Sequence, residues 1–169
     1  MEAIVYTSNT GTTKEYAKLL SDKLSLPYYS LDEIKNKVKP GGKIIYLGWI
    51  MASGVKGYKK AIKDYDVCAV GAVGMGATGT QVKEVRTKNK IPSSKPVFTL
   101  QGGFDVKKLH GIYKLMMTIM VKTAGKGLAN KQDRTQEEDQ MLEMMLHGGK
   151  YVDEKNLKAI LDWYGKRGE

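Results

Sequence analysis

The most informative segment of the sequence is Thr7-Ser8-Asn9-Thr10-Gly11-Thr12-Thr13. It follows an apolar run, Ala3-Ile4-Val5-Tyr6, and precedes apolar residues at helical spacing. A loop that leads from a strand into a helix presents unpaired backbone N–H groups and the positive end of the helix dipole. The hydroxyls of Ser8, Thr10, Thr12 and Thr13 add donors, and Gly11 lets the backbone turn closely around an anion. Helix capping alone would need only one of these hydroxyls, so the segment predicts a phosphate-binding loop.

Working outward, strand-like and helix-like segments alternate along the chain. Apolar, β-branched runs predict strands at residues 3–7, 43–47, 67–73 and 96–100, with a weaker candidate at 27–30. Helical spacing follows the first run and recurs at residues 58–64, 80–89 and 106–122. We therefore expect one domain over residues 1–169, an α/β three-layer sandwich with a parallel sheet covered by helices on both faces.

The carboxyl-terminal third is more polar. No helical period is visible at residues 123–139, which we interpret as a loop within a polar excursion at about 123–149. A short helix is expected at residues 137–146 and a longer one at 153–165, the second capped by Asp153 and covering the sheet.

Composition excludes several classes of protein. Of the 169 residues 41% are hydrophobic and 27% are charged, as in ordinary globular proteins. The single cysteine, Cys68, lies in an apolar run and is expected to be a buried, inert thiol, and the two histidines have no ligand partners at metal-binding spacing. No apolar stretch reaches the roughly 20 residues that cross a bilayer, and no leader pattern is visible, so we expect a cytoplasmic protein, with a peripheral location at the membrane as the alternative.

The net charge of +10 is unevenly distributed. Residues 1–131 carry a net +13, whereas residues 132–169 carry −3. Such an excess attracts an acidic partner protein or an anionic membrane surface. Because the lysines are scattered singly and arginines are few, we expect no nucleic-acid partner.

The loop also excludes nucleotide-triphosphate hydrolysis, because it lacks the Gly-Lys-Ser/Thr of that motif. Instead, residues 4–13, followed by Ala17 and Leu20, resemble the FMN phosphate-binding signature of the flavodoxins. That resemblance implies a flavodoxin-like fold, with a five-stranded parallel sheet of order 2-1-3-4-5, and FMN as the cofactor. It also implies that Ser8, Asn9, Thr10, Gly11, Thr12 and Thr13 hold the phosphate.

Two further loops are expected to flank the flavin ring, because ligands of such sheets lie beyond the carboxyl ends of the strands where strand order reverses. Similarity places residues 48–54 and 71–79 there. The expected ring-contacting residues are Trp49, Ile50, Met51, Ala52, Gly74, Met75 and Gly76. The family commonly has an aromatic residue where this chain has Met75. The alternative interpretation of Trp49 is a core residue beneath a neighbouring helix. The dinucleotide fingerprint formed by Gly74, Gly76 and Gly79 lacks the acid that should follow it.

The basic, methionine-rich segment at 106–122 is similar to the flavodoxin-like branch that contains the menaquinone-dependent protoporphyrinogen dehydrogenase. The simpler interpretation is that its apolar residues pack on the sheet. Alternatively, an exposed face carrying Lys107, Lys108, Lys114, Lys122 and Lys126 would contact anionic lipid, with a quinone within reach.

Three functions remain open from the sequence. The first is an electron carrier between proteins, the second is a flavin-dependent dehydrogenase of the protoporphyrinogen oxidase type that passes electrons to quinone, and the third is a module that holds FMN without redox work or has lost it. We favour an FMN-binding redox protein, either carrier or oxidoreductase, in which the flavin supplies the chemistry and no catalytic side chain or metal is needed.

Overall fold

The structure, a computed structural model, describes residues 1–104 and 111–167. For Phe104, Ile112 and Tyr113 only the backbone is described. The expectations for Lys107, Lys108 and His110 therefore lie outside the described residues.

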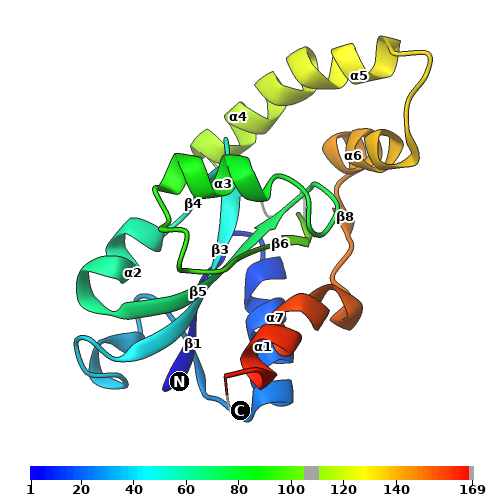
Figure 1. The fold of residues 1–169 in the computed structure, drawn as a ribbon. Helices are drawn as coiled ribbons and strands as arrows, with labels where there is room; N and C mark the ends of the chain where they lie inside the picture. The colour runs from blue at the N-terminus through cyan, green and yellow to red at the C-terminus, as the bar shows by residue number, and fades with distance from the viewer. Residues whose placement is uncertain (105–110, 168–169) are drawn as a thin grey trace.

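A parallel sheet forms the centre of the molecule (Figure 1). Its strands, in spatial order, are β2 (Tyr28–Ser30), β1 (Ala3–Thr7), β3 (Lys43–Met51), β5 (Asp66–Gly74) and β6 (Val97–Gln101). A short strand, β4 (Gly54–Val55), folds back antiparallel on the end of β3. If β4 is set aside, this is the expected 2-1-3-4-5 order, and the fold is a flavodoxin-like three-layer sandwich.

Helices cover both faces of the sheet, because successive strand residues point to opposite sides. Ile4 and Ile45 pack against α1 (Thr12–Leu24) and against the chain's last helices, the 3₁₀ turn Glu154–Leu157 and α7 (Lys158–Gly165). Val5 and Tyr46 face the other side, where the 3₁₀ turn Ile34–Asn36, α2 (Tyr58–Asp64) and α3 (Val82–Asn89) lie. Ile160 of α7 is fully buried, which confirms that the last helix covers the sheet.

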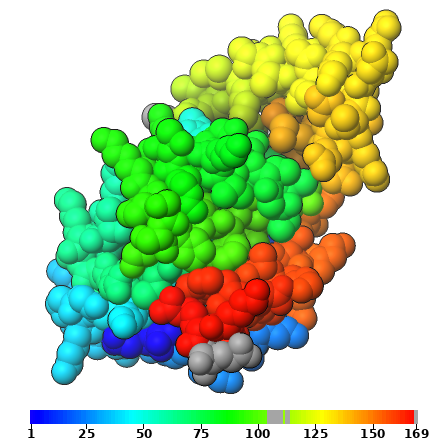
Figure 2. Space-filling view, viewed as in Figure 1, coloured from blue at the N-terminus to red at the C-terminus, as the bar shows by residue number. Residues whose placement is uncertain are grey.

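A helical arm leaves the sandwich after β6. Two short antiparallel strands, β7 (Gly103–Phe104) and β8 (Gly149–Lys150), form its base. Between them lie α4 (Gly111–Met120), a π-helical segment (Val121–Gly125), α5 (Lys126–Asn130) and α6 (Gln136–His147). We call residues 111–147 the arm. Figures 1 and 2 show it along one edge of the molecule, with α4 and α5 in yellow-green and yellow.

The expectation of a loop at residues 123–139 is wrong: helix continues to Asn130 and resumes at Gln136. Two contacts explain the sharp turn between the helices. The Arg134 guanidinium donates to three carbonyls at the end of α5, those of Leu128, Ala129 and Lys131, at 2.9–3.1 Å. Thr135 then forms a capping box with Glu138 at the start of α6.

The interpretation of the 106–122 segment as a sheet-packing helix also fails for its described part, because Leu115 and Ile119 of α4 are 59% and 53% exposed. Among the described residues, no helix is long and apolar enough to cross a membrane.

Candidate functional site

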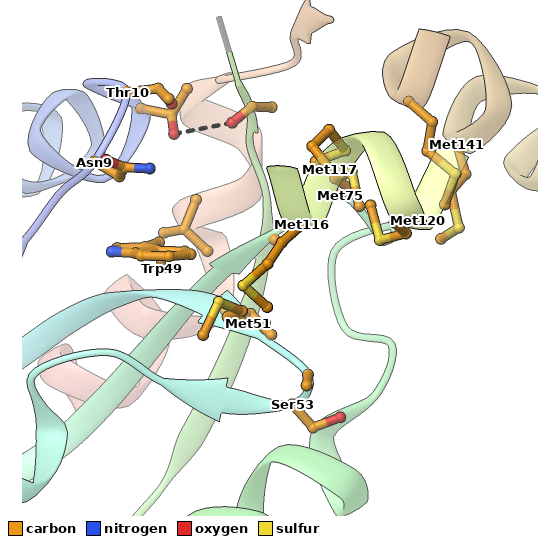
Figure 3. A pocket seen from close by; sticks show the side chains of 18 of the residues that line it. Asn9, Thr10, Trp49, Met51, Ser53, Met75, Met116, Met117, Met120 and Met141 are labelled. Atoms are coloured by element: carbon orange, nitrogen blue, oxygen red, sulfur yellow. Dashed lines mark hydrogen bonds between the residues drawn. The ribbon is translucent and has the colours of Figure 1, made fainter. Parts of the chain in front are cut away.

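The loop between β1 and α1 wraps around the amino-terminal end of the helix. Gly11 occupies the N-cap position with φ 104°, a left-handed conformation that favours glycine. Its N–H donates to Ser8 Oγ at 3.2 Å, which closes the loop on itself. Thr12 Oγ1 donates to the Gly103 carbonyl at 3.2 Å, the dashed line in Figure 3, so the loop is tied to the base of the arm.

The Thr13 hydroxyl is the most informative atom in this loop. The Thr13 side chain is fully buried in the first turn of α1, and Oγ1 is the one buried side-chain polar atom without a hydrogen-bond partner among the described residues. A buried hydroxyl without a partner costs about 1–3 kcal/mol. An anion held at the helix terminus would give it an acceptor, so the residues present fit a phosphate group.

The charges around the loop also favour an anion. Residues 7–13 contain no acidic side chain. The nearest carboxylate on α1, that of Glu15, forms an ion pair with Lys150 Nζ at 2.8 Å. Lys14 lines a hollow of about 340 Å³ together with Ser8, Asn9 and Gly11, and Asp32, which also lines it, forms an ion pair with Lys60 Nζ at 2.8 Å. The loop therefore lies in a positive local field.

A cavity of about 480 Å³ opens beside the loop (Figure 3). Asn9, Thr10 and Thr12 form its polar end. All seven expected ring-contacting residues line it, namely Trp49, Ile50, Met51, Ala52, Gly74, Met75 and Gly76. The structure thus brings three of the expected loop residues and all of the expected ring residues to one cavity, whereas Ser8, Gly11 and Thr13 are not part of its lining.

These residues meet because β3 and β5 are neighbours whose carboxyl ends lie at the same edge of the sheet. Trp49 of β3 pairs in register with Val73 of β5, and β1 borders β3 on the other side. Trp49, Ile50 and Met51 belong to β3 itself rather than to the loop expected there. The cavity lies at the point where strand order reverses, which is where ligands of such sheets bind.

The tight turn after β3 depends on a residue that sequence reasoning missed. Ala52 and Ser53 both adopt positive φ, 47° and 59°, a strained conformation for residues with a side chain. The buried Asn89 side chain donates to the Ser53 carbonyl at 2.9 Å and accepts from the Val55 N–H at 2.8 Å. Asn89 therefore fixes the turn at the edge of the cavity. Nothing in its position at the end of α3 indicates this role in the sequence.

Trp49 is not a core residue. It is partly buried and lines the cavity, and its ring is visible there in Figure 3. The Nζ atom of Lys56 lies 5.6 Å from the centre of the ring, within the range of a cation–π contact. The aromatic surface of the cavity is thus accompanied by a positive charge.

Methionines from the arm form the opposite wall, which the sequence analysis did not anticipate. Met116, Met117 and Met120 come from α4, and Met141 and Met145 from α6. With Met51 and Met75, seven of the nine methionines of the chain line this one cavity. The methionine-rich run at 115–120 is a sequence feature that indicates such a wall, but we interpreted it as packing on the sheet. Thioethers are polarisable and adapt to flat rings.

Neither the cysteine nor a metal cluster adds to this site. Cys68 is buried in β5, as expected, and burial raises the pKa of its thiol. Within residues 1–104 and 111–167, no group of three His, Cys, Asp or Glu side chains is placed to hold a metal ion.

Comparison with known proteins does not identify this chain: no protein-family model matches it, and neither does any curated protein or solved structure.

Proposed function

We propose that this chain binds FMN at the loop and cavity beside β1 and acts as a redox protein. One observation carries the proposal: Asn9, Thr10 and Thr12 of the hydroxyl-rich loop line the same cavity as Trp49. A ligand with a phosphate at one end and a flat ring system at the other has the shape and polarity of this site. The Thr13 hydroxyl without a partner adds an anchor for the phosphate.

In this proposal the side chains of the site bind and orient. The Ser8, Thr10 and Thr13 hydroxyls and the backbone N–H groups of the loop hold the phosphate, and the Thr12 hydroxyl joins them by exchanging its bond to the Gly103 carbonyl for one to the phosphate. Trp49 and Met75 contact the ring, and the backbone at Ala52 and Ser53 meets its edge. The arm methionines exclude water from the side of the cavity that they line. When bound, the flavin supplies the electron chemistry, so no side chain of the chain has to change its covalent state.

Fluorescence titration of FMN with the purified protein tests the proposal. Because bound flavin next to a tryptophan loses its fluorescence, we expect saturable quenching with one FMN per chain. The double variant Thr10→Glu/Thr12→Glu places two carboxylates where the phosphate would lie and is expected to abolish binding. The matched control is Ser93→Glu/Ser94→Glu, at two exposed positions in the turn before β6, which adds the same charge and should leave binding unchanged.

Two results would contradict the proposal. The first is the absence of quenching with the wild-type protein at up to millimolar FMN. The second is equal binding by the loop variant and the control, which would place FMN elsewhere.

A second candidate function is oxidation of an apolar organic substrate, of the protoporphyrinogen type, with a quinone as electron acceptor. The methionine wall favours it, because a carrier that serves proteins needs an accessible flavin edge, whereas here side chains of α4 and α6 line the cavity from that direction. The chemically reduced, FMN-loaded protein would be mixed with a short-chain quinone or with a one-electron acceptor protein such as cytochrome c. Faster reoxidation by the quinone supports the second candidate, and faster reoxidation by the protein supports the carrier. FMN that is bound but cannot be reduced would indicate a module without redox function.

A further inference from the structure

The outward side of the arm exposes large aliphatic side chains. Leu115 and Ile119 of α4 are 59% and 53% exposed, whereas Met116, which is 40% exposed, belongs to the cavity wall. Among the described residues only two other large hydrophobic side chains, those of Ile62 and Leu146, are comparably exposed. The inward side of the same helix is already used, because Met117 and Met120 line the cavity. The helix therefore has two apolar sides, one that faces the cavity and one that faces outward.

Lysines accompany this outward side. Leu115, Ile119, Lys122 and Lys126 follow one another at three- or four-residue spacing, so they share one side of the arm. Lys114, Lys122 and Lys126 are exposed, and within the described part of the chain none of them forms an ion pair. From residue 106 to residue 132 the sequence contains six lysines and no acidic residue.

The acidic residues of the arm all follow α5: Asp133 lies in the turn, and the other four lie on α6, where two of them are neutralised by ion pairs. Glu138 pairs with Lys131 at 2.6 Å, and Asp139 pairs with Arg134 at 2.5 Å. The positive charge of α4 and α5 is thus left uncompensated. Figures 1 and 2 show these two helices at the periphery of the molecule, where a flat surface can approach them.

We propose that the outward face of α4 and α5, centred on Leu115, Ile119, Lys122 and Lys126, docks on an anionic lipid surface. A helix that presents aliphatic side chains flanked by lysines lies in the interface, with its apolar residues among the acyl chains and its ammonium groups at the phosphates. The long lysine stems reach past the aliphatic residues to the headgroups. This inference goes beyond the proposed function and does not depend on FMN binding.

Two other occupants fit less well. Protein interfaces concentrate their energy in Trp, Tyr and Arg, and the residues at the centre of this face, Leu115, Ile119, Lys122 and Lys126, include none of these three types. A second copy of the chain would set the same lysines against one another across a symmetric contact, which is electrostatically unfavourable.

Vesicle sedimentation tests the docking face. The wild-type protein is expected to sediment with vesicles of phosphatidylglycerol and phosphatidylcholine but not with phosphatidylcholine alone, and 0.5 M salt should release much of it. The triple variant Ile119→Gln/Lys122→Gln/Lys126→Gln is expected to bind the anionic vesicles at least about tenfold more weakly, since each lysine near such a surface contributes severalfold in affinity.

The molecule contains a matched control on α2. Ile62 is 47% exposed and is flanked by the exposed Lys59 and Lys63. The variant Ile62→Gln/Lys59→Gln/Lys63→Gln therefore removes the same residue types and the same charge from another helix, and it should keep wild-type binding. Unchanged far-ultraviolet circular dichroism and thermal midpoints show that both triple variants are folded.

Three outcomes would overturn the proposal. One is the absence of wild-type binding to anionic vesicles. Another is an equal loss in both triple variants, which would show that net charge alone is responsible. The last is a dimer in light scattering that the α4 variant dissociates, because this face would then bind a second copy. All three measurements are made on protein with and without FMN, so a failure of flavin binding is detected separately.

Discussion

The Thr13 hydroxyl is expected to affect the stability of the protein and its ligand binding in opposite directions. The hydroxyl is fully buried and lacks a partner in the described structure, so it lowers the stability of the protein without a ligand, and in the proposed function it stabilises a bound phosphate. Thr13→Val keeps the shape and removes the hydroxyl. We expect the free energy of unfolding without ligand to rise by about 1 kcal/mol, while FMN binding weakens by about tenfold or more. Urea denaturation and fluorescence titration measure the two effects.

Thr99 provides the control for this prediction. It is also buried, but its Oγ1 donates to the Thr80 carbonyl at 2.6 Å. Thr99→Val should therefore lower the free energy of unfolding by about 1–2 kcal/mol, because a carbonyl loses its donor. If Thr13→Val destabilised the protein as much as Thr99→Val does, the Thr13 hydroxyl would have a partner already and would not be an anchor for phosphate.

At the scale of elements, the sandwich and the helices α4 and α6 were predictable from the sequence, whereas α5 and the position of the arm over the cavity were not. Strands such as β1 and β5 are nearly continuous apolar runs, because both faces of a parallel sheet are buried. Their carboxyl ends, together with the strand order and loop positions that the resemblance implies, predict the cavity residues. α5 buries none of its residues, so its sequence carries no clear period, and Gly125 and Gly127 further weaken the helical signal. The placement of the arm helices depends on local contacts, such as those of Arg134 and Thr135, that composition does not reveal.

The capping box of α6 predicts an acid-sensitive arm. The Glu138 carboxylate bonds with Lys131 and accepts from the Thr135 N–H, and these contacts hold its pKa below the usual 4.5. A carboxyl whose pKa is lowered by folding stabilises the folded form above its ordinary pKa, and the effect is lost as pH falls through the lowered value. We therefore expect the hydrogen-exchange protection of the α6 amides to decrease below about pH 4.5.

The variant Glu138→Gln isolates this effect, since glutamine completes a capping box but does not titrate in this range. Its α6 protection factors should be somewhat lower at pH 7, because the ion pair with Lys131 is missing, and should change little between pH 6 and pH 3.5. Protection in β5 provides an internal reference for global acid unfolding. The same decrease in both proteins would assign the acid sensitivity to other groups.

At the scale of the whole molecule, the excess positive charge makes the electrostatic potential at the cavity more positive. Flavin becomes more negative on reduction, so surrounding cations should raise its midpoint potential. Lys56, whose Nζ lies 5.6 Å from the centre of the Trp49 ring, is the closest described cation to that ring. Lys56→Gln is expected to lower the potential of bound FMN by roughly a few tens of mV at low salt, the size expected for one charge several ångströms away in a partly solvated site. Lys39→Gln removes an equal charge before β3, at the opposite edge of the sheet, and should change the potential little.

Because salt screens exposed charges, the potential of the wild-type protein should fall as ionic strength rises, and the difference in potential between wild type and Lys56→Gln should narrow. Redox titration with dyes at two salt concentrations measures both trends; a potential that is independent of salt and of Lys56 would mean that local contacts, rather than the field of the molecule, set the reactivity of the site.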